Sequence, residues 1–368
     1  MVNEKKENSA SEYLPFNPDY AVPPGDTLLE TIEYFGMSQA ELAERTGRPS
    51  KTINEIIKGK TAITPATALQ FERVLGVSAR LWNNLERNYR EALARQEERI
   101  QLENHLEWLK LVPVSIMVKY KWVKQHKDKI EQLKEVLNFF AIASPDAWHE
   151  VWGQFAVSYR KSSAFQSNPM AVSVWLRKGE IEAQKIDCKP FDKYRFKRTL
   201  NDIRILTNEP PNVFIQEIKR KCSDAGVAVV FARDMPGCPV SGATRWFNPN
   251  KALIQLSLRY KTDDHLWFTF FHEAGHILLH GKREVFLESD NKRDEKEEEA
   301  DHFASEILIP SSSLSDYLKH NTFSAISVQR FANHIGIAPG IVVGRLQYLG
   351  KLPYSHLNKL KRRFEWLN

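Results

Sequence analysis

A His-Glu-Ala-Gly-His run at residues 272–276 constrains this chain more than any other feature. Residues four apart lie on one face of a helix, so the side chains of His272 and His276 can reach the same metal ion. Glu273 lies one step round the helix, where its carboxylate can accept a proton from a metal-bound water. The residues on both sides of the run are apolar, which predicts a buried helix. A core helix with hydrogen-bonded histidines is the alternative.

A third metal ligand would favour the metal site, because a hydrolytic zinc usually takes three protein ligands and leaves one position for water. Three glutamates at residues 297–299 begin a second predicted helix, which Pro310 ends. At about 100° per residue, Glu297 lies closest to the centre of that helix's apolar face, and the other two point away. Asp301, one turn further on the same side, is placed to accept a hydrogen bond from a ligating imidazole. A solvated acidic helix start would leave Glu297 unexplained. We therefore expect Zn²⁺ on the two histidines and Glu297, although manganese or iron would also suit these ligands.

Residues from about 225 to 310 resemble the ImmA/IrrE family of metallo-endopeptidases, a gluzincin-like group. The matching pieces are the run Phe-Phe-His-Glu-Ala-Gly-His-Ile-Leu-Leu-His at 270–280 and the segment 297–310. The resemblance implies that the two histidines and Glu297 bind zinc and that Glu273 is the catalytic base. Family members are associated with the cleavage of helix-turn-helix repressors. The donor that stabilises the tetrahedral oxyanion stays open among four candidates: Tyr260, Arg245, His265 and His280.

The segment from Gly25 to about residue 95 is strongly helix-patterned, with short breaks at glycines. Ser38 is placed to cap one short helix, a Gly-Arg-Pro turn follows at 47–49, and Ser50 is placed to cap the next helix. Two short helices joined by a tight glycine turn form a helix-turn-helix, whose second helix usually enters the DNA major groove. Lysine and asparagine side chains there can contact phosphates and base edges. The expected DNA contacts are Gln39, Lys51, Thr52, Asn54, Lys58 and Lys60.

A small helical interaction module without DNA contacts is the alternative, because residues 23–95 hold 10 basic against 9 acidic side chains, a balance of only +1. The sequence pieces are nevertheless specific: Gly-Met-Ser-Gln-Ala-Glu-Leu-Ala at 36–43 and Ile-Ile-Lys-Gly-Lys-Thr-Ala-Ile-Thr at 56–64. With them, residues 24–95 resemble the HigA antitoxin branch of the Xre-type DNA-binding proteins. Members of that branch are usually short and end near this point, whereas this chain continues to residue 368.

Composition excludes several protein classes. No apolar run approaches the roughly 20 residues needed to span a bilayer, so no membrane partner is expected. The first residues have no apolar segment behind them, and we expect no secretory signal. The three cysteines are widely spaced and fit reduced thiols better than a disulfide framework. These features predict a cytoplasmic protein.

The expected fold is multidomain and mainly α, with a small α+β zincin-like domain and an N-terminal all-α helix-turn-helix domain. Runs of β-branched residues predict strands at 227–231 and 252–258, and residues 241–247 are a candidate third strand. Such a sheet leads into the metal helix, and its edge strand offers a place for an extended peptide. We expect a loose lead-in at 1–22, a helix-turn-helix domain at 23–95, a helical connector at 96–222, a metallopeptidase domain at 223–322 and a helical subdomain at 323–368.

Two functions fit these features best. The first is a transcriptional regulator that binds double-stranded operator DNA and carries a zinc-dependent endopeptidase, which cleaves a repressor, an antitoxin or the chain itself. The second is an antitoxin-like repressor whose metal site is structural or a sensor, without proteolysis. A palindromic operator would favour a homodimer, because half-site symmetry mirrors protein symmetry.

Overall fold

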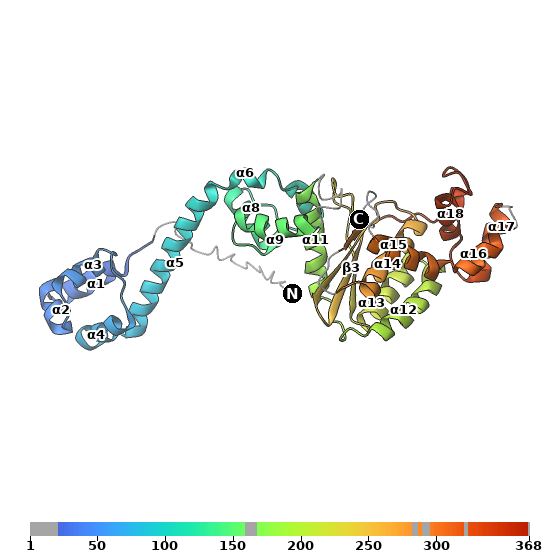
Figure 1. The fold of residues 1–368 in the computed structure, drawn as a ribbon. Coiled ribbons are helices and arrows are strands. Elements are labelled where there is room, and N and C mark those ends of the chain that lie inside the picture. Colours follow the sequence, from blue (N-terminus) through green and yellow to red (C-terminus); the bar gives the residue numbers. More distant parts are fainter. Residues whose placement is uncertain (1–20, 159–167, 282–285, 289–294, 320–322, 367–368) are drawn as a thin grey trace, which may run out of the picture. The chain divides into compact units, whose positions relative to one another are not determined.

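The computed structural model describes residues 21–158, 168–281, 286–288, 295–319 and 323–366. The expected lead-in at residues 1–22 lies almost entirely outside these ranges. The chain forms two compact units, Met1–His105 and Leu106–Asn368 (Figure 1). The expected mainly helical, multidomain fold is confirmed, while the finer division into five segments stays a prediction. Among the described residues, no helix is both long and apolar enough to cross a membrane.

The first unit is all helical. Its helices are α1 (Pro24–Tyr34), α2 (Gln39–Thr46), α3 (Ser50–Ile57), α4 (Pro65–Leu75) and α5 (Ala79–Glu103). They pack around one core of aliphatic side chains and two large rings, Phe71 and Trp82, whose centroids lie 5.6 Å apart. Helices as short as α1 to α4 are marginal in isolation, so burial of their apolar faces supplies most of the free energy that stabilises them.

The residues around the turn between α2 and α3 explain where each helix begins and ends, but one of the two expected caps is wrong. Ser38 caps α2 as expected, because its hydroxyl accepts a hydrogen bond from the Glu41 N–H. Gly47 ends α2 at a φ of 67°, a conformation that glycine adopts without steric cost. The expected cap at Ser50 is wrong. Ser50 is the first residue of α3, because Pro49 already occupies the N-cap position without offering a side-chain acceptor.

The second unit is built on a four-stranded sheet in the order β1-β3-β2-β4. The strands are β1 (Val227–Phe231), β2 (Gly242–Asn248), β3 (Lys251–Leu256) and β4 (Phe286–Glu288). Strand β1 runs parallel to β3, and β2 runs antiparallel to both β3 and β4. The three expected strands are confirmed with small shifts at their ends, while the short β4 was not anticipated.

Alternation along the strands gives the sheet two different faces. One face, which includes Val229 and Ile254, packs against α12 (Lys193–Ile205), α13 (Pro211–Ser223) and α14 (Asp263–Leu279). The opposite face is covered by α11 (Pro169–Gln184), where the Gln255 side chain donates to the Trp175 carbonyl at 2.7 Å. The motif at 272–276 therefore lies on one side of the sheet, and α11 lies on the other.

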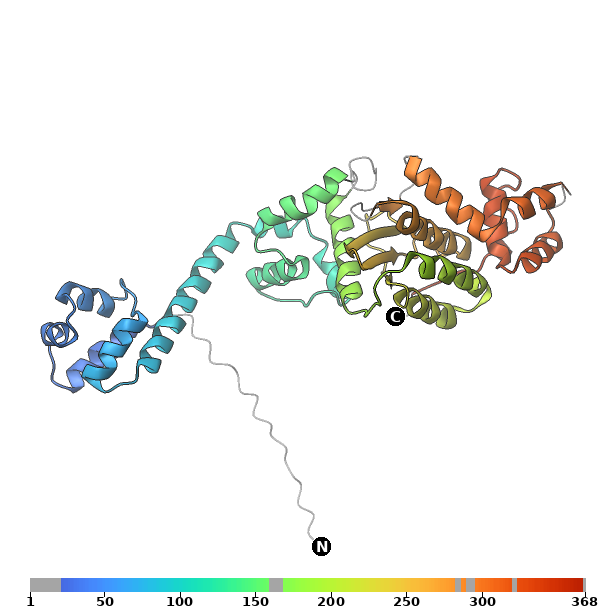
Figure 2. The same ribbon diagram turned by 60° about the horizontal axis from the view of Figure 1, so that its bottom comes forward.

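The rest of the second unit is helical. Its other helices are α6 (Leu106–Leu109), α7 (Val114–Lys119), α8 (Lys129–Phe140), α9 (Pro145–Ser158), α15 (Glu295–Leu308), α16 (Ser311–Leu318), α17 (Ala325–Ile335) and α18 (Pro339–Tyr348), with two short 3-10 turns, η1 (Leu206–Asn208) and η2 (Asn358–Leu360). The core around α14 includes side chains from α12 and α13 and from α17 and α18. Figure 2 shows the helices of the second unit grouped around the sheet. Residues on both sides of the boundaries expected at 222 and 322 thus share one core.

Candidate metal centre

Helix α14 carries the His-Glu-x-x-His run in the interior of the second unit. Large apolar rings precede the run, and Trp267 and Phe271 are almost fully buried in the core that the helix shares with the sheet. The side chains of His272, Glu273 and His276 are buried as well. The two imidazoles lie edge to face, with ring centroids 4.6 Å apart. Polar groups in such an interior cost free energy unless they find partners, and the neighbouring helix provides them.

Helix α15 approaches α14 closely because small residues meet where the two helices cross. A Cβ added to Gly275 would lie 3.3 Å from the Ala300 Cα and 3.2 Å from the Phe303 ring. Ala300 is itself fully buried. This approach brings the first turn of α15, and with it Glu297, to the two histidines.

Three possible ligand atoms converge at this crossing. Glu297 Oε2 lies 3.0 Å from His272 Nε2 and 3.5 Å from His276 Nε2. The two Nε2 atoms are 2.9 Å apart. Around a tetrahedral Zn²⁺ with bonds of about 2.0–2.1 Å, ligand atoms stand roughly 3.3 Å from one another. The side chains present therefore fit one zinc ion. Helix geometry predicted that Glu298 and Glu299 point away from the apolar face of α15, and both are exposed.

Two of the three possible ligands, His276 and Glu297, hold the protonation states that a metal requires. Burial lowers the pKa of His276 from 6.5 to about 4, which keeps its imidazole neutral. Burial alone would raise the pKa of Glu297, but hydrogen bonds with His272 and His276 outweigh it and lower this pKa to about 2. A neutral imidazole and an ionised carboxylate are the forms that coordinate a cation. At neutral pH the site needs no deprotonation of these two groups before a metal binds.

A second layer of side chains orients the two imidazoles. Asp301 Oδ1 lies 2.9 Å from His272 Nδ1, so this carboxylate can hold the ring with Nε2 left for a metal. His280 Nδ1 lies 2.9 Å from His276 Nδ1, and His280 Nε2 lies 3.0 Å from Glu299 Oε2. The role of Asp301 in orienting a ligating imidazole stays a prediction. The chain from His276 through His280 to Glu299 was missed, although the four-residue spacing of the two histidines is a signal for it.

Glu273 is fully buried on the side of α14 that faces β2. A Cβ added to Gly242 would lie 2.6 Å from Glu273 Oε1 and 2.5 Å from Thr269 Cγ2. The Thr244 hydroxyl donates a hydrogen bond to the backbone carbonyl of Glu273 at 3.0 Å. Sequence reasoning missed Gly242 and Thr244. A glycine inside a strand often marks the close approach of another group, and that was the available clue.

Arg245 is a wrong choice of oxyanion donor. Successive side chains of β2 point to opposite faces of the sheet. Thr244 contacts α14, so Arg245 points to the other face, where its guanidinium forms an ion pair with the buried Glu180 of α11. The sheet itself separates Arg245 from the metal centre.

The other three candidates for the oxyanion donor lie on the correct side of the sheet. His280 contacts His276 through its Nδ1 atom. The rings of Tyr260 and His265 stack with centroids 4.3 Å apart. His265 precedes Glu273 by eight residues, which is about 12 Å along a helix axis. These three residues stay predictions.

In the first unit, α3 exposes the side that was expected to contact DNA. Ile53 and Ile56 are buried on its opposite side. The expected contacts Lys51, Asn54, Lys58 and Lys60 are exposed, while Gln39 and Thr52 are partly buried. The geometry of a helix-turn-helix is therefore present, with the expected side chains accessible.

Two family models match this chain. The helix-turn-helix model matches residues 35–82, and the model described as an IrrE N-terminal-like domain matches residues 222–346. Among curated proteins, the HTH-type transcriptional regulator YddM of Escherichia coli is 29% identical over 79 residues, which are 22% of this chain and 82% of YddM.

Solved structures are similar to part of this chain. An addiction module antidote protein of a HigA family from Coxiella burnetii is 27% identical, with 23% of this chain and 92% of that chain covered and a TM-score of 0.22. The Pseudomonas aeruginosa antitoxin HigA with the higBA promoter is 29% identical, with 23% and 94% covered and the same TM-score of 0.22. By its two matched segments, this chain joins an N-terminal helix-turn-helix domain to a C-terminal IrrE N-terminal-like domain.

Proposed function

We propose that this chain is a DNA-binding transcriptional regulator whose second unit is a zinc-dependent endopeptidase. The observation that carries the peptidase is the convergence of His272, His276 and Glu297, whose ligand atoms lie within 4.8 Å of one another. The carboxylate of Glu273 is buried on the same helix. The IrrE N-terminal-like match includes all four residues, which supports a metallopeptidase rather than an accidental cluster.

The residues around the site divide the chemistry of peptide hydrolysis among them. Zinc held there would lower the pKa of a coordinated water and polarise the scissile carbonyl. Glu273 would accept the proton of the attacking water and pass it to the leaving amine. Asp301 and His280 would keep the two ligand rings in one orientation. Tyr260, His265 and His280 remain candidates for the oxyanion donor.

The two modules suggest the partners. The first unit would bind double-stranded operator DNA through α3, and the relative YddM is named a transcriptional regulator. The substrate of the second unit would be a repressor, an antitoxin or the chain itself, because a peptidase joined to a DNA-binding domain is brought to proteins that work on DNA. A palindromic operator would pair two copies of the chain. Such a regulator would be cytoplasmic.

The test compares the wild type with Glu273→Gln. Each protein is incubated alone and with the repressors or antitoxins encoded beside its gene, with and without EDTA, and products are identified by mass spectrometry. We expect cleavage by the wild type only, with no cleavage in EDTA. Zinc content, measured by plasma mass spectrometry, should be equal in the two proteins. Glu298→Gln, an exposed neighbour of the ligand, is the matched control and should cleave normally. Cleavage by Glu273→Gln would remove the assigned mechanism.

A second candidate function is an antitoxin-like repressor whose metal site is structural or a sensor. The burial of the site favours it, since His272 is 2% exposed, His276 1% and Glu273 0%. Structural zinc sites are closed, whereas catalytic sites keep a position open to water and substrate. A wild type that holds zinc, cleaves none of these proteins and loses operator affinity when zinc is removed would support this function over proteolysis.

A further inference from the structure

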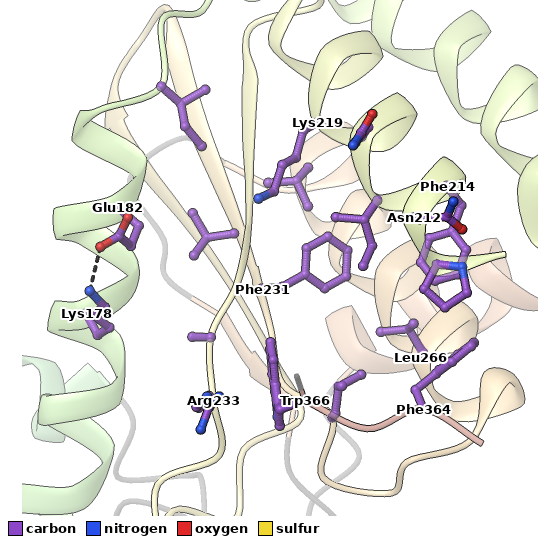
Figure 3. Close-up of a pocket in the computed structure, with 18 of the residues that line it drawn as sticks. Lys178, Glu182, Asn212, Phe214, Lys219, Phe231, Arg233, Leu266, Phe364 and Trp366 are labelled. Atoms are coloured by element: carbon purple, nitrogen blue, oxygen red, sulfur yellow. Dashed lines mark hydrogen bonds and ion pairs between the residues drawn. The ribbon is translucent and has the colours of Figure 1, made fainter. Parts of the chain in front are cut away.

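Strand β1 forms one edge of the sheet, and a cavity of about 1080 Å³ lies along it. Residues of α11 and α13 line the cavity together with residues 363–366 (Figure 3). All of these residues belong to the second unit. The edge is remote from the metal centre in the sheet order, because β3 separates β1 from β2, the strand that contacts Glu273. The cavity is therefore a different site from the candidate metal centre.

Pairing with β3 determines which backbone groups of β1 are already used. The Gly226 carbonyl accepts a hydrogen bond from β3 at 3.1 Å, and the Ala232 N–H donates one to β3 at 2.9 Å. In a parallel strand, the N–H and C=O of a residue point to the same side, and the side alternates along the chain. Val229 and Phe231 therefore direct their N–H and C=O away from β3, and both residues line the cavity, Val229 as a buried residue and Phe231 as a half-buried one. A row of such groups is a template for one more strand.

Aromatic rings supply the apolar part of the lining. Phe214 of α13, Phe231 of β1, and Phe364 and Trp366 of the chain's last residues surround the cavity (Figure 3). The buried indole N–H of Trp366 has no acceptor in the part of the chain that the structure describes. The cavity thus offers a largely aromatic surface for apolar contacts.

The charged residues of the lining are mostly basic. The six basic residues are Lys178, Lys185, Lys219, Arg220, Arg233 and Arg363, and the two acidic ones are Glu182 and Glu365. Glu182 already pairs with Lys178 at 2.5 Å and with Lys185 at 3.0 Å. Arg220 pairs with Glu217 and Asp224, which lie outside the lining. Lys219 and Arg363 have no ion-pair partner among the described residues. Because the positive charges outnumber the negative ones, the cavity attracts an acidic ligand and disfavours a basic one.

We propose that this cavity binds an extended acidic peptide segment of a partner protein, which adds a fifth strand beside β1. Main-chain hydrogen bonds to Val229 and Phe231 would supply affinity, and alternate side chains would reach the two sides of the cavity. Apolar side chains of the peptide cover the rings, and its carboxylates meet Lys219 and Arg363. Binding requires neither zinc nor Glu273, so this site stands independently of the proposed peptidase.

The first experiment measures binding of a model peptide to the full chain by fluorescence anisotropy. The probe is a fluorescein-labelled ten-residue peptide of alternating valine and glutamate. We expect it to bind more than about tenfold tighter than the matched peptide of valine and lysine, because like charges repel in the basic cavity. The valine and glutamate peptide with every second backbone nitrogen methylated should not bind, since it lacks the donors that a strand requires. Equal binding of all three peptides, or no binding of the first, overturns the proposal.

The second experiment locates the site. Lys219→Glu and Arg363→Glu should each weaken binding of the acidic peptide, whereas Lys197→Glu, an exposed α12 residue outside the lining, should not. Hydrogen exchange followed by NMR on the wild-type chain does not depend on any variant folding. The peptide should slow exchange of the Val229 and Phe231 amides and leave Val230, which faces β3, unchanged. Protection without this alternation, or charge reversals without effect, contradicts strand addition at β1. Glu273→Gln should bind the peptide like the wild type.

Discussion

Gly242 on β2 lies against the carboxylate of Glu273 on α14. A side chain at this strand position would begin 2.6 Å from Glu273 Oε1, well inside van der Waals contact. The strand therefore sets how far the carboxylate can move, and the absence of a side chain at Gly242 leaves room for it. This relationship links the sheet directly to the proposed general base.

Gly242→Ala should displace Glu273 without touching a metal ligand. The methyl group collides with Thr269 as well, so overpacking should lower the free energy of unfolding by about 1–3 kcal/mol. We expect cleavage to fall while zinc content stays at the wild-type level. Thermal unfolding, metal analysis and the cleavage assay measure these effects. Ser241→Ala adds no atom and serves as the control. An unchanged melting temperature together with unchanged cleavage would show that the strand does not restrict Glu273.

Glu297→Gln should lose zinc while Glu298→Gln keeps it. Both changes remove one negative charge from the same turn of α15, but Glu297 alone places an oxygen beside both imidazoles. The loss of affinity should exceed the roughly 10–100-fold that removal of a supporting hydrogen-bond partner costs. Competition with a chromogenic zinc chelator measures it. Equal affinities in the two variants would mean that Glu297 is not a ligand.

His280→Ala and Asp301→Asn should each weaken zinc binding by about 10–100-fold. The first removes the partner of the His276 Nδ1 atom, and the second removes the negative charge beside the His272 Nδ1 atom. His302→Ala changes an exposed histidine of the same region and should have no effect. The same chelator competition applies. If His280→Ala binds zinc with the wild-type affinity, the contact between His280 and His276 does not orient the His276 ring.

The metal-free protein should lose stability as the pH falls. The unfolded His276 imidazole takes up a proton near pH 6.5, whereas the folded one does so only near pH 4. The unfolded state therefore binds more protons between these values, and the free energy of unfolding falls by roughly 3 kcal/mol across the window. Glu297 extends the loss below pH 4.5, because its folded pKa is about 2.

Urea denaturation of the EDTA-treated chain at several pH values checks this expectation. His276→Asn has no group that titrates at this position, so its stability should depend less on pH between 6.5 and 4. A variant curve parallel to that of the wild type would place the proton uptake elsewhere.

DNA binding should respond differently to the two types of exposed residue on α3. Lys58→Ala removes a possible phosphate contact, so it should weaken binding to all sequences and lower the salt slope by about 1. Asn54→Ala removes a possible base contact and should cost about 1–3 kcal/mol on the operator only. Titrations of labelled DNA at several salt concentrations separate the two. Arg87→Ala, on the exposed side of α5, is the control. Full operator affinity in both variants would exclude α3 as the recognition helix.

Sequence patterns within single helices were sufficient to predict much of the candidate metal centre. Four-residue spacing placed His272 and His276 on one face, and helix winding separated Glu297 from its two acidic neighbours. Both arguments depend only on helix geometry within one segment. The cap at Ser50 failed for a local reason too, since Pro49 displaced the helix start by one residue.

Contacts between segments were less predictable. The sequence offers Arg245 as one of four candidates for the oxyanion donor, yet strand alternation directs it toward α11 and Glu180. Packing decides whether the odd-numbered or the even-numbered side chains of a strand face a given helix. A shift of the strand pairing by one residue would exchange the two faces. The absence of a side chain at Gly242 matters only because α14 packs over this position of β2.

The sequence by itself determined the two helical motifs, the metal-ligand types and their spacing, because these depend on side-chain chemistry and on the period of a single helix. Only the tertiary structure decided that α15 meets α14 at Gly275, that His280 contacts His276, and that β1 lies at an edge of the sheet beside a basic cavity. Those features arise from the packing of segments distant in the chain, and a one-dimensional pattern carries no information about which surfaces meet.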